Sequence, residues 1–176
     1  MIVVVDVANV LGSRPDGWWR DRAGAAGRLL DRLDALPGST VDGPDGEPAR
    51  VDRLIAVLEG AARSAATGRT APVGPGHSIE VIEAQRDGDA AVVEFVDALG
   101  TEAGTETGTG VGTESGTGVG TESGTGVGTE SGTRVGTGGP GPGDVLVVTA
   151  DRGLRARLPA AVRTVGPNWL NGLIGR

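Results

Sequence analysis

Short apolar runs rich in β-branched residues recur along this chain, and they constrain its fold more than any other feature. Three of them are Ile2–Val5, Leu54–Leu58 and Val145–Ala150. Runs of this kind are typical of strands buried on both faces, as in a parallel sheet. They alternate with segments whose apolar residues recur at helical spacing. The order predicts a three-layer α/β/α Rossmann-like fold with a central, mainly parallel sheet of about five strands.

The same patterns place the individual elements. Strands are expected at residues 2–5, 51–58, 77–84, 144–150 and 162–165. Helices are expected at residues 18–36, 87–99 and 151–158, with a last helix beginning near Pro167. Residues 12–17 and 38–48 are predicted to be loops because they are rich in Gly, Pro and Asp. Residues 61–76 are predicted to be an irregular connection.

A glycine-rich tract at residues 100–143 interrupts this alternation. The octet Gly-Val-Gly-Thr-Glu-Ser-Gly-Thr occurs there three times without change, beginning at Gly110. Its apolar content is too low to offset the entropy lost on ordering. We expect a disordered, low-complexity insertion within a single domain that spans residues 1–176.

The formal charge of −7 is unevenly distributed. The tract holds five Glu and one Arg, which gives −4 there and leaves −3 for the remainder. The net charge outside the tract is therefore only slightly negative, which is compatible with a nucleic-acid partner. The chain has no cysteine, which excludes disulfides and thiolate metal sites. No apolar stretch has membrane-spanning length, so we expect a cytoplasmic protein that does not bind membranes.

Acidic residues follow the predicted strands at the points where those strands end. Asp6, Glu59 and Asp151 come directly after apolar runs, and Asp89 lies shortly after a fourth. Ligands of open α/β sheets bind outside the carboxyl ends of the strands. Carboxylates gathered there are costly unless a cation neutralises them. The pattern predicts a site for Mg²⁺ or Mn²⁺ and metal-assisted hydrolysis.

Each of these acids also has a purely structural interpretation. Asp6 and Asp151 are placed to cap the helices that follow them. Asp87 and Asp89 lie at the predicted start of a helix, where the helix dipole favours carboxylates. Glu59 is equally well explained as an exposed acid at a strand end. An α/β domain whose acids are all caps therefore remains one alternative.

Aromatic and basic residues follow the first predicted loop. Trp18 and Trp19 are two of only three Trp in the chain. They offer a stacking surface for bases, although one buried and one half-exposed Trp explain them equally well. Arginines near the predicted site are candidates for phosphate contacts, although solvated arginines are the simpler explanation for most of them. These candidates are Arg14, Arg20, Arg22, Arg152 and Arg155.

Four motifs together resemble the NYN domains of the PIN-like nuclease superfamily. They are Val-Asp-Val-Ala-Asn-Val at residues 5–10, Pro-Asp-Gly-Trp-Trp-Arg-Asp-Arg at 15–22, Asp-Gly-Asp-Ala-Ala-Val at 87–92 and Val-Thr-Ala-Asp-Arg-Gly-Leu at 148–154. The resemblance implies a PIN-like fold whose acids hold Mg²⁺ or Mn²⁺ for phosphodiester hydrolysis, usually of RNA. It implies roles for Asp6, Asn9, Asp89 and Asp151 at the catalytic centre.

Two positions depart from that family pattern. Val7 stands where Gly is usual, and Ala90 stands where a second Asp is common. Ala90 favours one metal rather than two, or a module that binds RNA or a nucleotide without cutting it. The main prediction is an endoribonuclease whose metal ligands come from Asp6, Asp87, Asp89, Asp151 and Glu59. A phosphatase for small phosphoesters is a further alternative, and the oligomeric state stays open, a homodimer included.

Overall fold

The central sheet has five strands, and all of its strand pairs are parallel. The computed structural model describes residues 1–67, 79–104 and 144–176. Within these ranges the strand order is β5-β4-β1-β6-β7. The strands are β1 (Ile2–Asp6), β4 (Arg53–Leu58), β5 (Glu80–Glu83), β6 (Val145–Val148) and β7 (Arg163–Val165). The predicted α/β fold with a mainly parallel, five-stranded central sheet is confirmed.

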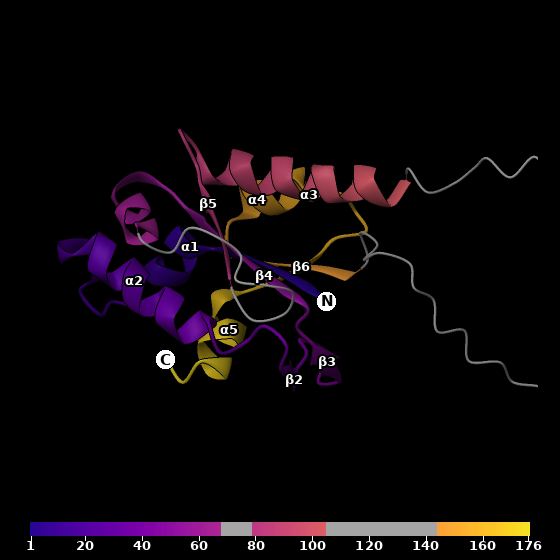
Figure 1. Ribbon diagram of the computed structural model, residues 1–176, viewed down its shortest axis with the longest axis horizontal. Helices are drawn as coiled ribbons and strands as arrows, with labels where there is room; N and C mark the ends of the chain where they lie inside the picture. The colour runs from indigo at the N-terminus through magenta and orange to yellow at the C-terminus, as the bar shows by residue number, and fades with distance from the viewer. Residues whose placement is uncertain (68–78, 105–143) are drawn as a thin grey trace, which may run out of the picture.

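Helices cover both faces of the sheet (Figure 1). One core cluster joins the sheet to α1 (Val7–Gly12), α2 (Arg22–Leu33) and α5 (Pro167–Leu173). A second cluster, on the opposite face, joins it to α3 (Gly88–Gly104) and α4 (Arg152–Arg157). The alternation along β1 explains this division, because Val3 and Val5 enter the first cluster while Ile2 and Val4 enter the second.

Two local predictions were wrong, and one short helix was not predicted. Residues 38–48 do not form a simple loop, because β2 (Thr40–Asp42) and β3 (Pro48–Arg50) pair as an antiparallel hairpin. Residues 7–12 form the short helix α1, which Asp6 caps. The predicted helix at 18–36 is divided into a 3₁₀ turn, η1 (Trp18–Arg20), and α2, because Asp21 leaves helical geometry and caps α2 by accepting from the Gly24 N–H.

The helix α3 runs from the carboxyl edge of the sheet back toward the amino edge, where β6 begins. It ends at Gly104, so the first five residues of the predicted insertion are helical. The rest of that insertion, residues 105–143, lies outside the described residues, as does His77 with the start of the predicted third strand. The described part of the connection at 61–76 forms η2 (Gly60–Ala66), a 3₁₀ helix. No helix in the described ranges is both long and apolar enough to cross a membrane.

Candidate active site at the carboxyl edge of the sheet

The order in which successive strands are added to the sheet reverses at β1. After β1 the chain adds β4 and β5 on one side and then places β6 and β7 on the other. Ligands of such sheets bind beside the strand pair at which the order reverses, here β1 and β6. The register pairs Val5 with Val148, so Asp6 and Thr149 leave the sheet side by side at its carboxyl edge.

The Thr149 hydroxyl connects the two acids that follow these strands. Its side chain is fully buried. The hydroxyl donates to Asp6 Oδ2 at 3.0 Å and accepts the N–H of Asp151 at 3.0 Å. One hydroxyl therefore fixes the carboxylate of Asp6 and the backbone from which Asp151 projects. The structure thus brings Asp6 and Asp151 together, although they are distant in the sequence.

Both acids are also helix caps, as their structural interpretation predicts. Asp6 Oδ1 accepts the N–H of Asn9 at 3.0 Å, and Asp151 Oδ1 accepts the N–H of Leu154 at 3.0 Å. These bonds orient the carboxylates without using all of their capacity, because each carboxylate oxygen has two lone pairs. Capping and cation binding by Asp6 and Asp151 are therefore compatible with each other.

Glu59 reaches the same edge from the end of β4 and contacts the start of α3. Its Oε2 accepts the N–H of Gly88 at 2.9 Å. A Cβ at position 88 would lie only 2.8 Å from this oxygen, so glycine permits the close approach. Asp87 is exposed, and its Oδ1 accepts the N–H of Asp89 at 3.0 Å, so it caps α3. Glu59 and Asp87 both hold the helix start that carries Asp89.

The charges of these acids act on one another. Burial raises the pKa of Asp6 above its ordinary value of 3.8, and the negative charges of Asp89 and Glu59 raise it further. The hydrogen bonds from Asn9 and Thr149 lower it, but they do not reverse the direction. The Asp6 carboxylate is thus held in place by hydrogen bonds while its negative charge is disfavoured.

Asp89 is subject to the same repulsion. Burial raises its pKa, and the carboxylates of Asp151, Asp87 and Glu59 raise it further. Arg157 acts in the opposite direction, but its guanidinium nitrogen lies 3.9 Å from Asp89 Oδ2, at the limit for an ion pair. The arginine therefore compensates only part of the negative charge at this edge.

This donor set fits a hydrated divalent cation rather than a closed protein cage. Within residues 1–67, 79–104 and 144–176, no group of three acidic, His or Cys side chains is close enough to hold a metal ion as it stands. Mg²⁺ commonly keeps several waters and uses only one or two carboxylates. Asp6 and Asp89, whose charges repel, supply oxygen donors of the preferred type.

Asn9 connects the acids to a neighbouring pocket. Its Oδ1 accepts the N–H of Ala150 at 2.9 Å, which fixes the orientation of the amide. A pocket of about 420 Å³ lies beside this residue, in the size range of small-ligand sites. Small residues surround it, and its lining is Ala8, Asn9, Gly12, Ser13 and Ala150.

Trp18, in the 3₁₀ turn η1, lies close to this pocket, and Trp19 follows it. Trp18 is partly buried against the core, while Trp19 is 51% exposed. Their rings form an edge-to-face pair at 6.3 Å, and the Arg22 guanidinium lies 5.3 Å from the Trp18 ring centre. A Cβ on Gly12 would lie 3.9 Å from the Trp18 ring, which places that ring next to the pocket.

Apart from Arg22, which lies over Trp18, the arginines predicted to bind phosphate divide into two groups. Arg14, Arg20 and Arg152 are exposed, and their guanidinium groups make no ion pair with any described residue. Arg155 instead donates from Nε and Nη2 to the Thr149 carbonyl, at 3.1 and 2.5 Å. Arg155 is therefore a support of the β6 terminus, whereas the other three are available to a ligand.

Comparisons with known proteins give little beyond these observations. No protein-family model matches the sequence, and no curated protein matches it. The crystal structure of a point mutant of Rae1 (YacP) from Bacillus subtilis is similar to this chain, with a TM-score of 0.49 and 12% sequence identity. The match covers 99% of this chain and 74% of that chain. At this level the likeness transfers no residue role and no activity.

Sequence reasoning missed two features of the site. It did not identify Thr149 as the residue whose hydroxyl bonds to both Asp6 Oδ2 and the Asp151 N–H. It also did not predict that Val7, which stands where the family pattern has Gly, is fully buried in the core cluster that includes α1. The spacing of Val7, Val10 and Leu11, three and four residues apart, is the signal that could have placed Val7 on the buried face of α1.

The raised pKa values predict how stability depends on pH. Between about 4 and the raised folded values, the folded state binds more protons than the unfolded state at Asp6 and Asp89. The contribution of these two groups to the free energy of unfolding therefore falls as pH rises through that window. We expect Asp89→Asn to reduce the fall and to add about 0.5 kcal/mol at pH 7 without metal.

Urea unfolding in EDTA at several pH values measures this effect. Asp97→Asn, an exposed position on the same helix, is the matched control and should follow the wild type. Identical pH slopes for the wild type and Asp89→Asn would show that no repulsion acts on Asp89.

Proposed function

We propose that the protein is a metal-dependent phosphodiester hydrolase, and specifically a NYN-type endoribonuclease. The observation that carries this proposal is the mutual repulsion of Asp6 and Asp89 at the carboxyl edge of the sheet, beside β1 and β6, where the strand order reverses. Acids concentrated where ligands of such sheets bind imply a cationic ligand. The four motifs that resemble NYN domains support RNA as the substrate, because they supply these same acids.

Asp6 and Asp89 would hold Mg²⁺ or Mn²⁺, with Asp151 and Glu59 acting directly or through water. When bound, the metal supplies an acidified water and neutralises charge on the phosphoryl group. The Thr149 hydroxyl and the Asn9 N–H keep the Asp6 carboxylate in one orientation. Glu59 holds the start of α3, which keeps Asp89 at the same edge.

Asn9 and the exposed arginines would bind the substrate. Because Asn9 Oδ1 accepts from Ala150, the amide NH₂ remains free to donate to a phosphate oxygen at the pocket. Arg14, Arg20 and Arg152 would contact neighbouring phosphates. Trp19, half-exposed next to Trp18, would offer its face to a base.

Metal binding should raise the thermal stability of this protein. A ligand that binds only the folded state stabilises it by about 2.7 kcal/mol at 100 times its Kd. We expect Mn²⁺ to raise Tm and to support cleavage of a single-stranded RNA, and EDTA to reverse both effects. A Tm that does not respond to Mn²⁺ or Mg²⁺, together with cleavage that persists in EDTA, would remove the metal-dependent mechanism.

A module that binds RNA without cutting it is the second candidate. Ala90 is exposed next to Asp89 and supplies no carboxylate, and the described residues hold no ready-made set of three ligands. Such a module would bind RNA equally well in EDTA and in Mn²⁺ and would give no product. Product formation that depends on metal, in protein free of contaminating nuclease, would decide for the enzyme.

A further inference from the structure

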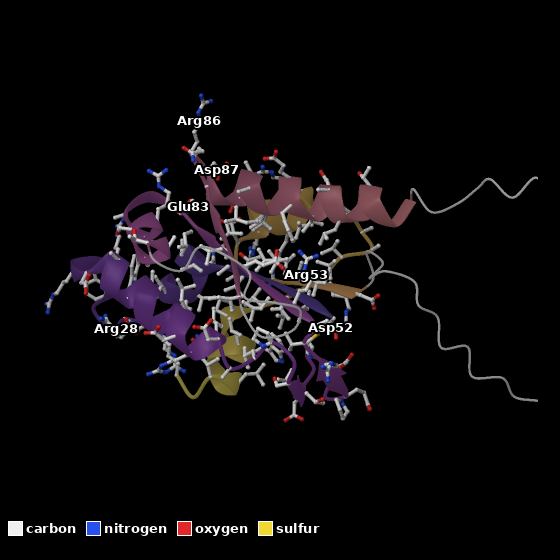
Figure 2. All side chains as sticks on the ribbon, viewed as in Figure 1. Arg28, Asp52, Arg53, Glu83, Arg86 and Asp87 are labelled. Carbon is white, nitrogen blue, oxygen red and sulfur yellow. The ribbon has the colours of Figure 1, made fainter. Side chains whose placement is uncertain are left out.

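A second pocket, separate from the acidic edge, lies on the outer side of α2 against the last residues of the chain. Its volume is about 190 Å³, which equals roughly six water volumes. Figure 2 shows Arg28 extending from the outer side of α2. Three arginines gather around an apolar floor, and the lining is Asp16, Ala25, Arg28, Leu29, Arg32 and Arg176.

The Arg176 guanidinium is only partly satisfied. Its Nη2 donates to Asp16 Oδ2 at 2.6 Å, and its side chain is 13% exposed. Its Nη1 is buried and has no hydrogen-bond partner among the described residues. A buried donor of a charged group without a partner is costly, so this nitrogen points to a missing acceptor.

Arg28 and Arg32 add further positive charge. They lie four residues apart on one helix, a spacing at which like charges repel. Arg28 faces Asp21 at 3.6 Å, but both side chains are more than 60% exposed, so this ion pair is weak. Within the described part of the chain, Arg32 donates only to the Gly175 carbonyl, at 3.4 Å. Among the side chains named here, three arginines therefore face two carboxylates, Asp16 and Asp21.

We propose that this arginine pocket binds a phosphate group. Guanidinium groups match phosphate oxygens in geometry and charge, and three of them converge here on one small pocket. The phosphate could be inorganic phosphate or a phosphodiester of an RNA strand. The RNA source rests on the proposed function, whereas phosphate binding itself does not.

The structure connects this pocket to the candidate active site. Arg176 N–H donates to the Asn171 carbonyl at 2.8 Å, and the fully buried Asn171 side chain donates to Ser13 Oγ at 3.1 Å. Ser13 lines the pocket beside Asn9. The loop of residues 13–17 therefore contributes to both pockets, with Ser13 lining the first and Asp16 lining the second.

The first test measures Tm in inorganic phosphate against chloride at equal ionic strength. The pocket variant is Arg28→Gln/Arg32→Gln, and the control is Arg50→Gln/Arg163→Gln, which removes the same charge near the hairpin. Phosphate should raise Tm in the wild type and the control but not in the pocket variant. An equal rise in all three proteins would show only a general salt effect and would overturn the proposal.

The second test measures binding of a single-stranded RNA in EDTA over a range of salt concentrations. If the RNA backbone occupies the pocket, the pocket variant should lose about 0.7 from the slope of log K against log salt for each lost phosphate contact. A lost phosphate response with an unchanged RNA slope would support a free-phosphate site. Unchanged results in both assays would overturn the proposal. Neither assay requires cleavage, so a failed nuclease assay does not affect this test.

Discussion

Replacing Asp6 with Asn should lower metal-dependent RNA cleavage by at least about 100-fold, because the change removes a proposed metal-ligand carboxylate. Mutating residues that only support such ligands already lowers metal affinity or activity by about 10–100-fold. The variant keeps an oxygen that can accept the Asn9 N–H, so the cap on α1 is retained. It also removes a charge that burial and neighbouring acids disfavour, which offsets the loss of the oxygen that accepts the Thr149 hydroxyl. Initial rates in Mn²⁺ and Tm in EDTA measure the two effects, and we expect little change in Tm.

The control for Asp6→Asn is Asp45→Asn. Asp45 lies between β2 and β3, pairs with Arg163 at 3.3 Å and is 56% exposed. The two variants change the net charge equally, so a general electrostatic effect on RNA binding should appear in both. Cleavage by Asp6→Asn at the wild-type rate, in protein free of contaminating nuclease, would remove Asp6 from the mechanism.

Replacing Thr149 with Val should have the largest effect on stability. The substitution preserves the shape of a fully buried side chain but deletes a hydroxyl that bonds to both Asp6 and the Asp151 N–H. Hydrogen bonds to charged groups contribute about 1.5–3 kcal/mol. For a domain of the size that the structure describes, 126 residues, a loss of about 2 kcal/mol lowers Tm by roughly 8 °C.

The conservative variant Thr149→Ser separates positioning from packing. Ser restores the hydroxyl and lacks only a methyl group, so we expect cleavage to recover more fully than in Thr149→Val. A purely structural role would make both variants lose stability with kcat unchanged in the folded fraction. Measuring kcat below the Tm of each variant distinguishes these cases.

The sheet was predictable from the sequence because its strands are nearly continuous apolar runs. Ile2–Val5 is buried on both faces, and such runs occur where helices cover both sides of a sheet. The last helix was equally clear, because Pro167 occupies its first turn. These signals are local, and each depends on a few consecutive residues.

The hairpin and the short helix depend on contacts that a local pattern does not contain. β2 and β3 have three residues each, and exposed or half-exposed side chains dominate both. α1 has six residues, too few for a helical repeat to be visible. Its start is set by Asp6, whose side chain accepts the Asn9 N–H, and the sequence left capping and cation binding equally open.

The acidic edge was predictable in outline, whereas the hydrogen bonds that join its residues were not. Parallel strands bring their carboxyl ends to one edge, so acids that follow strands were expected to meet there. Nothing in the sequence around Thr149 indicates that its hydroxyl donates to Asp6, which is 143 positions away. The arginine pocket is equally non-local, because it joins α2 to the chain end.

The repetitive tract is attached near the amino edge of the sheet, opposite the carboxyl edge that carries the acids. The chain leaves the described structure after Gly104, at the far end of the helix whose first turn carries Asp89, and it returns at Asp144, just before β6. Copies of the octet can therefore be gained or lost over generations without displacing a carboxylate. The chemistry of this protein and the length of its repetitive tract are free to diverge independently.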